Sequence, residues 1–128
     1  MDMMTRIYNA MMDDNYIVEK AYGRIKYYEY PPTDNLTEPH IIIDPLDTPT
    51  AAEFADDTWL TDDYLYQIEI WSNNRLVTKG LADRVRMIMW DLGFRQSGGI
   101  DEWDKDYNIF RDARRYRGKA YRTDLDSL

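Results

Sequence analysis

The stretch from Asp62 to Gly93 changes its hydrophobic period once, and this change constrains the fold more than any other feature of the sequence. Up to Trp71, successive side chains would fall on opposite sides of an extended chain. One side would carry Tyr64, Tyr66, Ile68 and Ile70, and the other the residues between them. A period of two predicts a central strand from Tyr64 to Trp71. From Leu76 onward, apolar residues recur every three or four positions, at Val77, Leu81, Val85, Ile88 and Leu92. This spacing predicts an amphipathic helix.

The boundaries of this helix are also visible in the sequence. Ser72, Asn73 and Asn74 offer N-cap side chains, and Gly93 stands where a left-handed C-cap residue is expected. We therefore predict a helix over residues 74–92, directly after the strand. A helix with one apolar stripe must bury it, and the nearest apolar surface is the strand that precedes it.

Composition limits the classes of protein that the chain can represent. With 128 residues it is long enough for one hydrophobic core, and we expect one α+β domain over residues 1–122 and a flexible tail over 123–128. The absence of cysteine excludes disulfides, zinc-thiolate sites and thiol catalysis. No apolar run approaches a membrane span and no signal peptide is present, so we expect a soluble intracellular chain.

The N-terminal half contains shorter periodic segments. A short amphipathic helix is predicted from Asp2 to about Met12, and whether Tyr16 to Tyr22 is also helical stays open. Arg24 to Tyr30 alternates and is predicted to be a strand, followed by a loop from Pro31 to Pro39. The run Ile41 to Ile43 suits a strand that is buried on both faces.

The remaining segments differ in how clearly they can be interpreted. Residues 45–57 are rich in Pro, Thr, Ala and Asp and indicate first an excursion from the core, with a short edge strand at Ala52 to Phe54 as the alternative. Phe94 to Trp103 and Tyr107 to Tyr121 predict a C-terminal β-hairpin with a glycine bulge. The predicted fold class is thus α+β: a mixed or antiparallel sheet packed by one long helix and a short N-terminal helix.

Charge is distributed unevenly along the chain. The net charge is −8, yet the segment from Lys105 to Arg122 contains seven basic and two acidic residues, a local charge of +5. An acidic chain with one basic edge can pair head to tail with copies of itself. The candidate interface residues on the basic side are Arg111, Arg114, Arg115, Tyr116 and Arg117. Their candidate acidic counterparts are Asp56, Asp57, Asp62 and Asp63.

Motifs for catalysis or metal binding are weak. The single histidine, His40, has no partner at metal-ligand spacing and is interpreted as a strand-edge residue. The adjacent acidic pairs lack a third ligand, so capping and turn roles are the default interpretation. Gly98 and Gly99 lack the lysine of a phosphate loop and indicate a bulge instead. We predict no catalytic, cofactor-binding or metal-binding residue and no enzyme activity, with a metal-dependent nuclease as the third alternative.

The basic segment has two other interpretations. Its arginines alternate with aromatic residues at Tyr107, Phe110, Tyr116 and Tyr121, a composition that also binds single-stranded nucleic acid. The acidic remainder of the chain would repel that polymer. The segment would otherwise be a solvated edge strand whose charges prevent aggregation.

The order of elements resembles a known family. It rests mainly on the strand–helix unit QIEIWSNNRLVTKGLADRVRMIMWDLGF, with the Pro-flanked isoleucine strand before it and the arginine- and tyrosine-rich hairpin after it. Over residues 4–121 the chain resembles the tail terminator and tail-to-head joining proteins of long-tailed bacteriophages (siphoviruses). The apparent excursion over residues 45–57 departs from the family pattern.

The resemblance implies a function and a set of partners. Such proteins are structural: they form a hexameric ring that ends the tail tube and presents a surface to the DNA-filled head. Implied partners are copies of this chain, the tail tube protein and the head–tail connector proteins, with no membrane, no cofactor and genomic DNA passing without specific binding. The implied location is the head–tail interface of the virion, and the host cytoplasm during assembly. A head-side connector or stopper, and a small nucleic-acid-binding regulatory module, are the alternatives.

Overall fold

The computed structural model describes residues 2–28 and 38–122, which contain three helices and six strands. The helices are α1 (Met3–Met12), α2 (Asn15–Ala21) and α3 (Arg75–Asp91). The strands are β1 (Ile25–Tyr27), β2 (His40–Pro45), β3 (Thr50–Ala55), β4 (Thr58–Ser72), β5 (Phe94–Asp104) and β6 (Ile109–Tyr121). The expected tail over residues 123–128, and most of the loop expected from Pro31 to Pro39, lie outside the described residues.

The strands form one six-stranded sheet in the order β1-β2-β4-β6-β5, and β3 also pairs with β4. Only β1 and β2 are parallel, and the other neighbours are antiparallel. The predicted α+β class with a mixed sheet is therefore confirmed. The central strand begins at Thr58 rather than Tyr64, because the chain stays extended before the sheet body starts.

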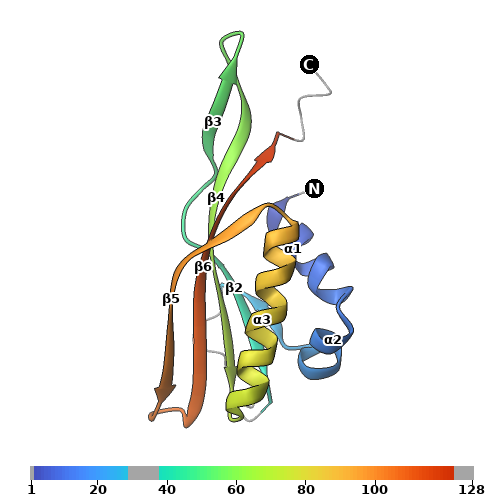
Figure 1. Cartoon of the computed structure of the whole chain (residues 1–128), viewed down its shortest axis with the longest axis vertical. Coiled ribbons are helices and arrows are strands. Elements are labelled where there is room, and N and C mark those ends of the chain that lie inside the picture. The colour runs from blue at the N-terminus through green and yellow to red at the C-terminus, as the bar shows by residue number, and fades with distance from the viewer. Residues whose placement is uncertain (1, 29–37, 123–128) are drawn as a thin grey trace.

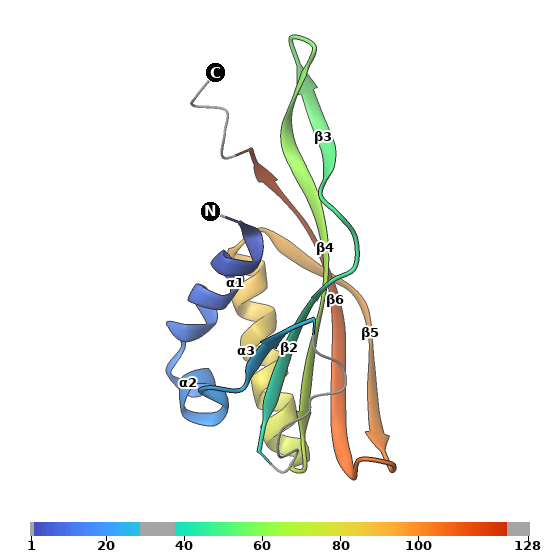
Figure 2. The same cartoon turned by 180° about the vertical axis from the view of Figure 1, so that it is seen from behind.

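All three helices lie on the same face of the sheet (Figures 1 and 2). On that face β4 presents Tyr66, Ile68 and Ile70, which are at most 6% exposed and belong to the main core cluster. The buried residues of α3 are Thr78, Leu81, Ala82, Val85 and Met89, and the remaining residues of the predicted stripe pack against this cluster at its margin. The prediction that the helix packs its apolar stripe against the preceding strand is therefore confirmed.

Side-chain caps begin each helix. Carboxylate oxygens of Asp2 and Asp14 accept hydrogen bonds from the backbone amides of Thr5 and Ile17, at 3.1 and 3.0 Å. Asn74 does the same for α3, and Gly93 follows its end with φ at +96°. These contacts satisfy amides that have no partner within the helix.

The N-terminal half differs from expectation mainly in lengths. The segment left open from Tyr16 onward is helical, as α2, and the strand expected over Arg24 to Tyr30 is described only over Ile25–Tyr27. Ile41, Ile42 and Ile43 are wholly buried, which confirms the predicted strand. His40 begins that strand as expected but is fully buried rather than at an exposed edge.

Residues 45–57 correct the first interpretation of that segment. Thr50–Ala55 is a strand, β3, which pairs antiparallel with β4 from Thr58 to Asp63. The edge-strand alternative at Ala52 to Phe54 is thus confirmed and extended. Together residues 50–61 form a two-stranded ribbon, here called the arm, which projects beyond the helices and the rest of the sheet (Figure 1).

Two glycines give a test of the packing between β5, β6 and α3. A Cβ atom on Gly118 would lie 2.6 Å from the Phe94 ring and 2.8 Å from the Gly93 carbonyl oxygen. We expect Gly118→Ala to lower the free energy of unfolding by about 1–3 kcal/mol through overpacking.

At Gly80 in α3, the added Cβ meets only the movable end of Tyr16, at 2.8 Å. Gly80→Ala should therefore be neutral or stabilising by up to about 1 kcal/mol because alanine favours helix. Urea denaturation measures both, and equal effects would contradict this packing.

Candidate interaction surface

The arm is largely exposed to solvent. Five of the six residues of β3 are exposed, and the Phe54 side chain is 71% exposed. Asp56 and Asp57 form the loop at its tip, with φ of +51° and +64°. A two-residue hairpin loop favours this left-handed backbone, which glycine or asparagine adopts with least strain. Here the loop instead places two exposed carboxylates at the end of the arm.

On the sheet face away from the helices, β6 is tied to β4 by a buried ion pair. Arg111 Nε lies 2.6 Å from Glu69 Oε1, and the Glu69 side chain is 2% exposed. Trp71 Nε1 and Gln67 Nε2 donate to the two Glu69 oxygens, at 3.0 and 2.9 Å. Arg111 also donates to Glu102 on β5, at 2.8 Å. The predicted interface residue Arg111 is thus engaged within its own subunit.

A second charged network joins β6 to α3 on the helix-covered face. Arg114 Nε and Lys79 Nζ each lie 2.9 Å from an oxygen of Asp112, whose side chain is 2% exposed. Lys79 also pairs with Asp101, and Arg114 reaches Asp83 at 3.5 Å. Burial lowers the pKa of both cations, but their hydrogen bonds to these carboxylates outweigh it and raise each pKa above its ordinary value.

The other predicted interface residues occupy different environments. Tyr116 is 1% exposed and packs in the core, whereas Arg115 and Arg117 are exposed on the opposite face of β6. Arg117 pairs with Asp63 at 3.0 Å, and Arg115 Nε donates to Gln67 at 3.2 Å. Asp62 accepts a hydrogen bond from Trp59 Nε1 at 3.1 Å. The structure thus brings Arg117 and Asp63 together within one chain and leaves Asp56 and Asp57 apart, at the tip of the arm.

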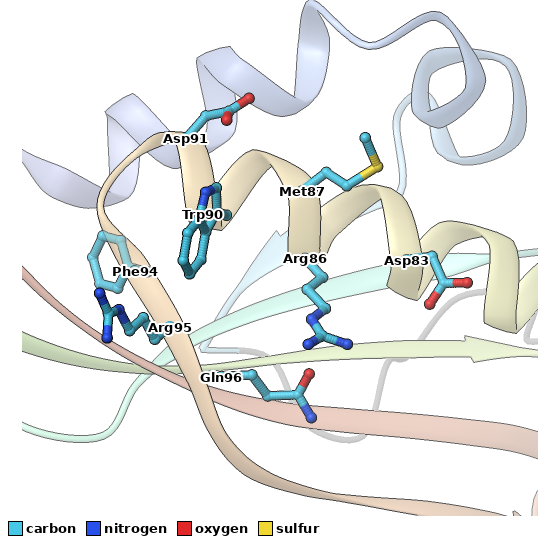
Figure 3. A pocket seen from close by; sticks show the side chains of 8 residues that line it. All are labelled: Asp83, Arg86, Met87, Trp90, Asp91, Phe94, Arg95 and Gln96. Carbon is cyan, nitrogen blue, oxygen red and sulfur yellow. The ribbon is translucent and has the colours of Figure 1, made fainter.

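A surface that sequence reasoning missed lies where α3 ends and β5 begins. A pocket of about 620 Å³ is bounded by Met87 and Trp90 of α3, and by Arg95 and Gln96 of β5 (Figure 3). Met87 and Trp90 are each 62% exposed, and the Arg95 guanidinium lies 5.5 Å from the centre of the Trp90 ring. The signal was present, because Met87 and Trp90 interrupt the polar side of an otherwise amphipathic helix.

The described residues contain no group of three or more His, Cys, Asp or Glu side chains arranged to hold a metal ion. Among the same residues, no helix has the length and apolar character that crossing a membrane requires.

Comparisons with known proteins give one informative result. No protein-family model and no curated protein matches the sequence. Among solved structures, a chain from the "Virion of native gene transfer agent (GTA) particle" superposes with a TM-score of 0.62 at 12% identity. The match covers 91% of this chain and 92% of that chain. The two chains therefore share a fold over most of their lengths.

The buried ion pair leads to a stability test with an internal control. Glu69 and Glu102 both bind Arg111, but their side chains are 2% and 43% exposed. We expect Glu69→Ala to lower the free energy of unfolding by about 3 kcal/mol, because it removes the buried carboxylate that holds Arg111 and Trp71 and leaves Arg111 only the more exposed Glu102. Glu102→Ala should lower it by less than about 1 kcal/mol. Chemical denaturation measures both values, and similar losses would contradict the assigned role of Glu69.

The core tyrosines predict how stability changes at high pH. Burial is the main cause that raises the pKa of Tyr116 and of Tyr66 to about 12, from an ordinary value of 10. Above pH 10 the unfolded chain loses these protons first, so stability falls as pH rises from 10 to 12. Tyr116→Phe should reduce the loss of unfolding free energy between pH 10 and pH 12 by on the order of 2 kcal/mol. Tyr121→Phe, at a residue that is 72% exposed, is the control and should leave the slope unchanged. Urea denaturation across this pH range gives the slopes.

Proposed function

We propose that this protein is a structural component of a phage-like virion, and that it caps the tail tube as an oligomeric ring where tail and head join. The observation that carries the proposal is the fold shared with a chain of the gene transfer agent virion over 91% of this chain. A match over 91% of this chain and 92% of that chain extends over most of the elements of the fold. The order of elements noted in the sequence supports the finer assignment to a tail terminator.

The distribution of surface features also supports assembly. A ring needs two unlike patches on each subunit, so that every subunit uses both. The arm, which projects beyond the helices (Figure 1), carries the acidic tip, Asp56 and Asp57. On β6, Arg115 and Arg117 are exposed, and Arg117 is the register partner of Arg95 on β5. We propose that these exposed arginines, rather than the whole predicted set, form the basic side of the contact.

The other predicted residues contribute to this interface indirectly. Arg111 and Arg114 hold β6 against β4 and α3, and Tyr116 fills the core. Reversing Arg114 to Glu would place a carboxylate beside the buried Asp112 and destabilise the subunit itself. A charge-reversal test of assembly must therefore use the exposed pair.

We expect Arg115→Glu with Arg117→Glu to weaken ring formation at least tenfold, because the new carboxylates repel the acidic arm of the neighbour. Their present partners are a glutamine and the half-buried Asp63, but the Arg117 side chain is itself 56% exposed, so the free energy of unfolding should fall by about 1 kcal/mol. Light scattering after size-exclusion chromatography, and negative-stain microscopy of the purified protein, measure assembly.

The control is Arg75→Glu with Lys105→Glu, which reverses the same number of charges. These residues are exposed at the start of α3 and in the β5–β6 turn, at the end of the molecule opposite the arm (Figure 1). Equal loss of assembly in both double variants would sink the assignment of the exposed β6 arginines. Gold labelling of the chain in purified particles tests the virion role directly. Label at the head–tail junction supports it, label only on the head side favours a connector, and particles without label contradict it.

A further inference from the structure

The tip of the arm presents an exposed aromatic ring beside exposed carboxylates. Residues 53–60 of the arm lie beyond the last register pair of β4 with β6, Thr61 with Tyr121. Lys119 reaches this part of the arm through an ion pair with Glu53 at 3.7 Å, and Arg122 reaches it through hydrogen bonds to Thr58, Trp59 and Leu60. An isolated two-stranded hairpin is only marginally stable in water. Glu53, Asp56 and Asp57 all have positive φ, at +38°, +51° and +64°, which adds strain to this ribbon. Phe54, beside them, has a side chain that is 71% exposed.

The pocket between α3 and β5 has complementary properties. Met87 and Trp90 supply its exposed apolar side chains. Arg86 and Arg95 stand at its margin, and neither has an ion pair with a described carboxylate (Figure 3). Two acidic residues also line it: Asp83 contacts Arg114 at 3.5 Å, and Asp91 is exposed. The pocket thus offers apolar side chains and two guanidinium groups that can donate hydrogen bonds to carboxylates.

We propose that the arm of one copy docks in this pocket of the next copy, with Phe54 against Met87 and Trp90 and the tip carboxylates beside Arg86 and Arg95. An aromatic ring between a tryptophan and a methionine is a typical anchor of a protein interface. The tip has three acidic residues and no basic residue within residues 50–60, so the charge complementarity selects this surface over the acidic remainder of the chain. The contact is heterologous, because arm and pocket are different surfaces.

This inference rests on the proposed ring, since it names the surfaces through which the subunits of that ring would meet. It also explains why the tip has aspartates where glycine would relieve the strain. Arg95 lines the pocket and is also the register partner of Arg117, so the pocket adjoins the strand that carries the exposed β6 arginines.

The absence of cysteine in the chain makes a cross-linking test direct. Two single variants, Phe54→Cys and Met87→Cys, are purified separately, mixed and oxidised with copper phenanthroline. We expect disulfide-linked heterodimers in at least tenfold excess over a control mixture of Phe54→Cys with Leu76→Cys. Leu76 is 70% exposed on the same helix, about 16 Å from Met87 at 1.5 Å per residue. Equal yields in the two mixtures, or products of Phe54→Cys with itself only, would overturn the proposal.

A second measurement uses affinity instead of cross-linking. Phe54→Ala should weaken self-association at least tenfold without changing the free energy of unfolding. Tyr22→Ala removes an aromatic ring that is 65% exposed elsewhere and should leave self-association unchanged. Both experiments are repeated on particles that contain the variants. Rings or labelled particles without enrichment of the Phe54→Cys and Met87→Cys link would overturn this contact alone. A chain that neither self-associates nor enters particles would overturn the proposed function and the contact together.

Discussion

The structure depends on the unbroken pairing of β4, which runs for 15 residues and connects the sheet body to the arm. From Thr61 to Ser72 it pairs with β6 on one side, and β2 and β3 follow one another along its other side. Because one strand belongs to both the core and the arm, the direction of the arm is set by the packed core and not by a flexible linker. The helices contribute by holding the apolar face of β4, at Tyr66, Ile68 and Ile70.

The buried charges give the sheet its register and decide which charges remain for partners. Glu69 meets Arg111 across 42 residues of sequence, and Asp112 meets both Lys79 and Arg114. Each of these carboxylates is nearly inaccessible to solvent, so a shift of β6 along β4 would leave a buried charge without its partner. The same contacts pair Arg111 and Arg114, two of the basic residues of the C-terminal segment, with carboxylates of their own chain. A nucleic-acid surface would need those cations to be free, which is why the interaction surface is better described by the arm, the exposed β6 arginines and the pocket.

Sequence reasoning succeeded where one face of an element is buried and failed where neither face is. The alternation before Trp71 and the spacing after Leu76 predicted β4 and α3 because both elements have a core-facing side. Residues 50–55 lack a usable pattern because nearly all of them are exposed, so a strand there looks like a loop. The interface residues were chosen by charge, and charge alone does not show that Arg111 and Arg114 have partners 42 and 2 residues away or that Tyr116 is in the core. Those facts depend on register, which sequence spacing does not give.

A rigid arm has a consequence for the geometry of assembly. Heterologous contacts build a closed ring only if the rotation from one subunit to the next closes, and otherwise they build an open filament. In this chain that rotation would be set by the angle between the arm and the pocket, both of which are continuous with regular elements: the arm with β4, and the pocket with α3 and β5. That angle would in turn depend on the right-handed twist of β4 along its length. A ring built in this way would owe its closure to the length and twist of one strand, and a change in the length of the arm would alter subunit number before it altered subunit stability.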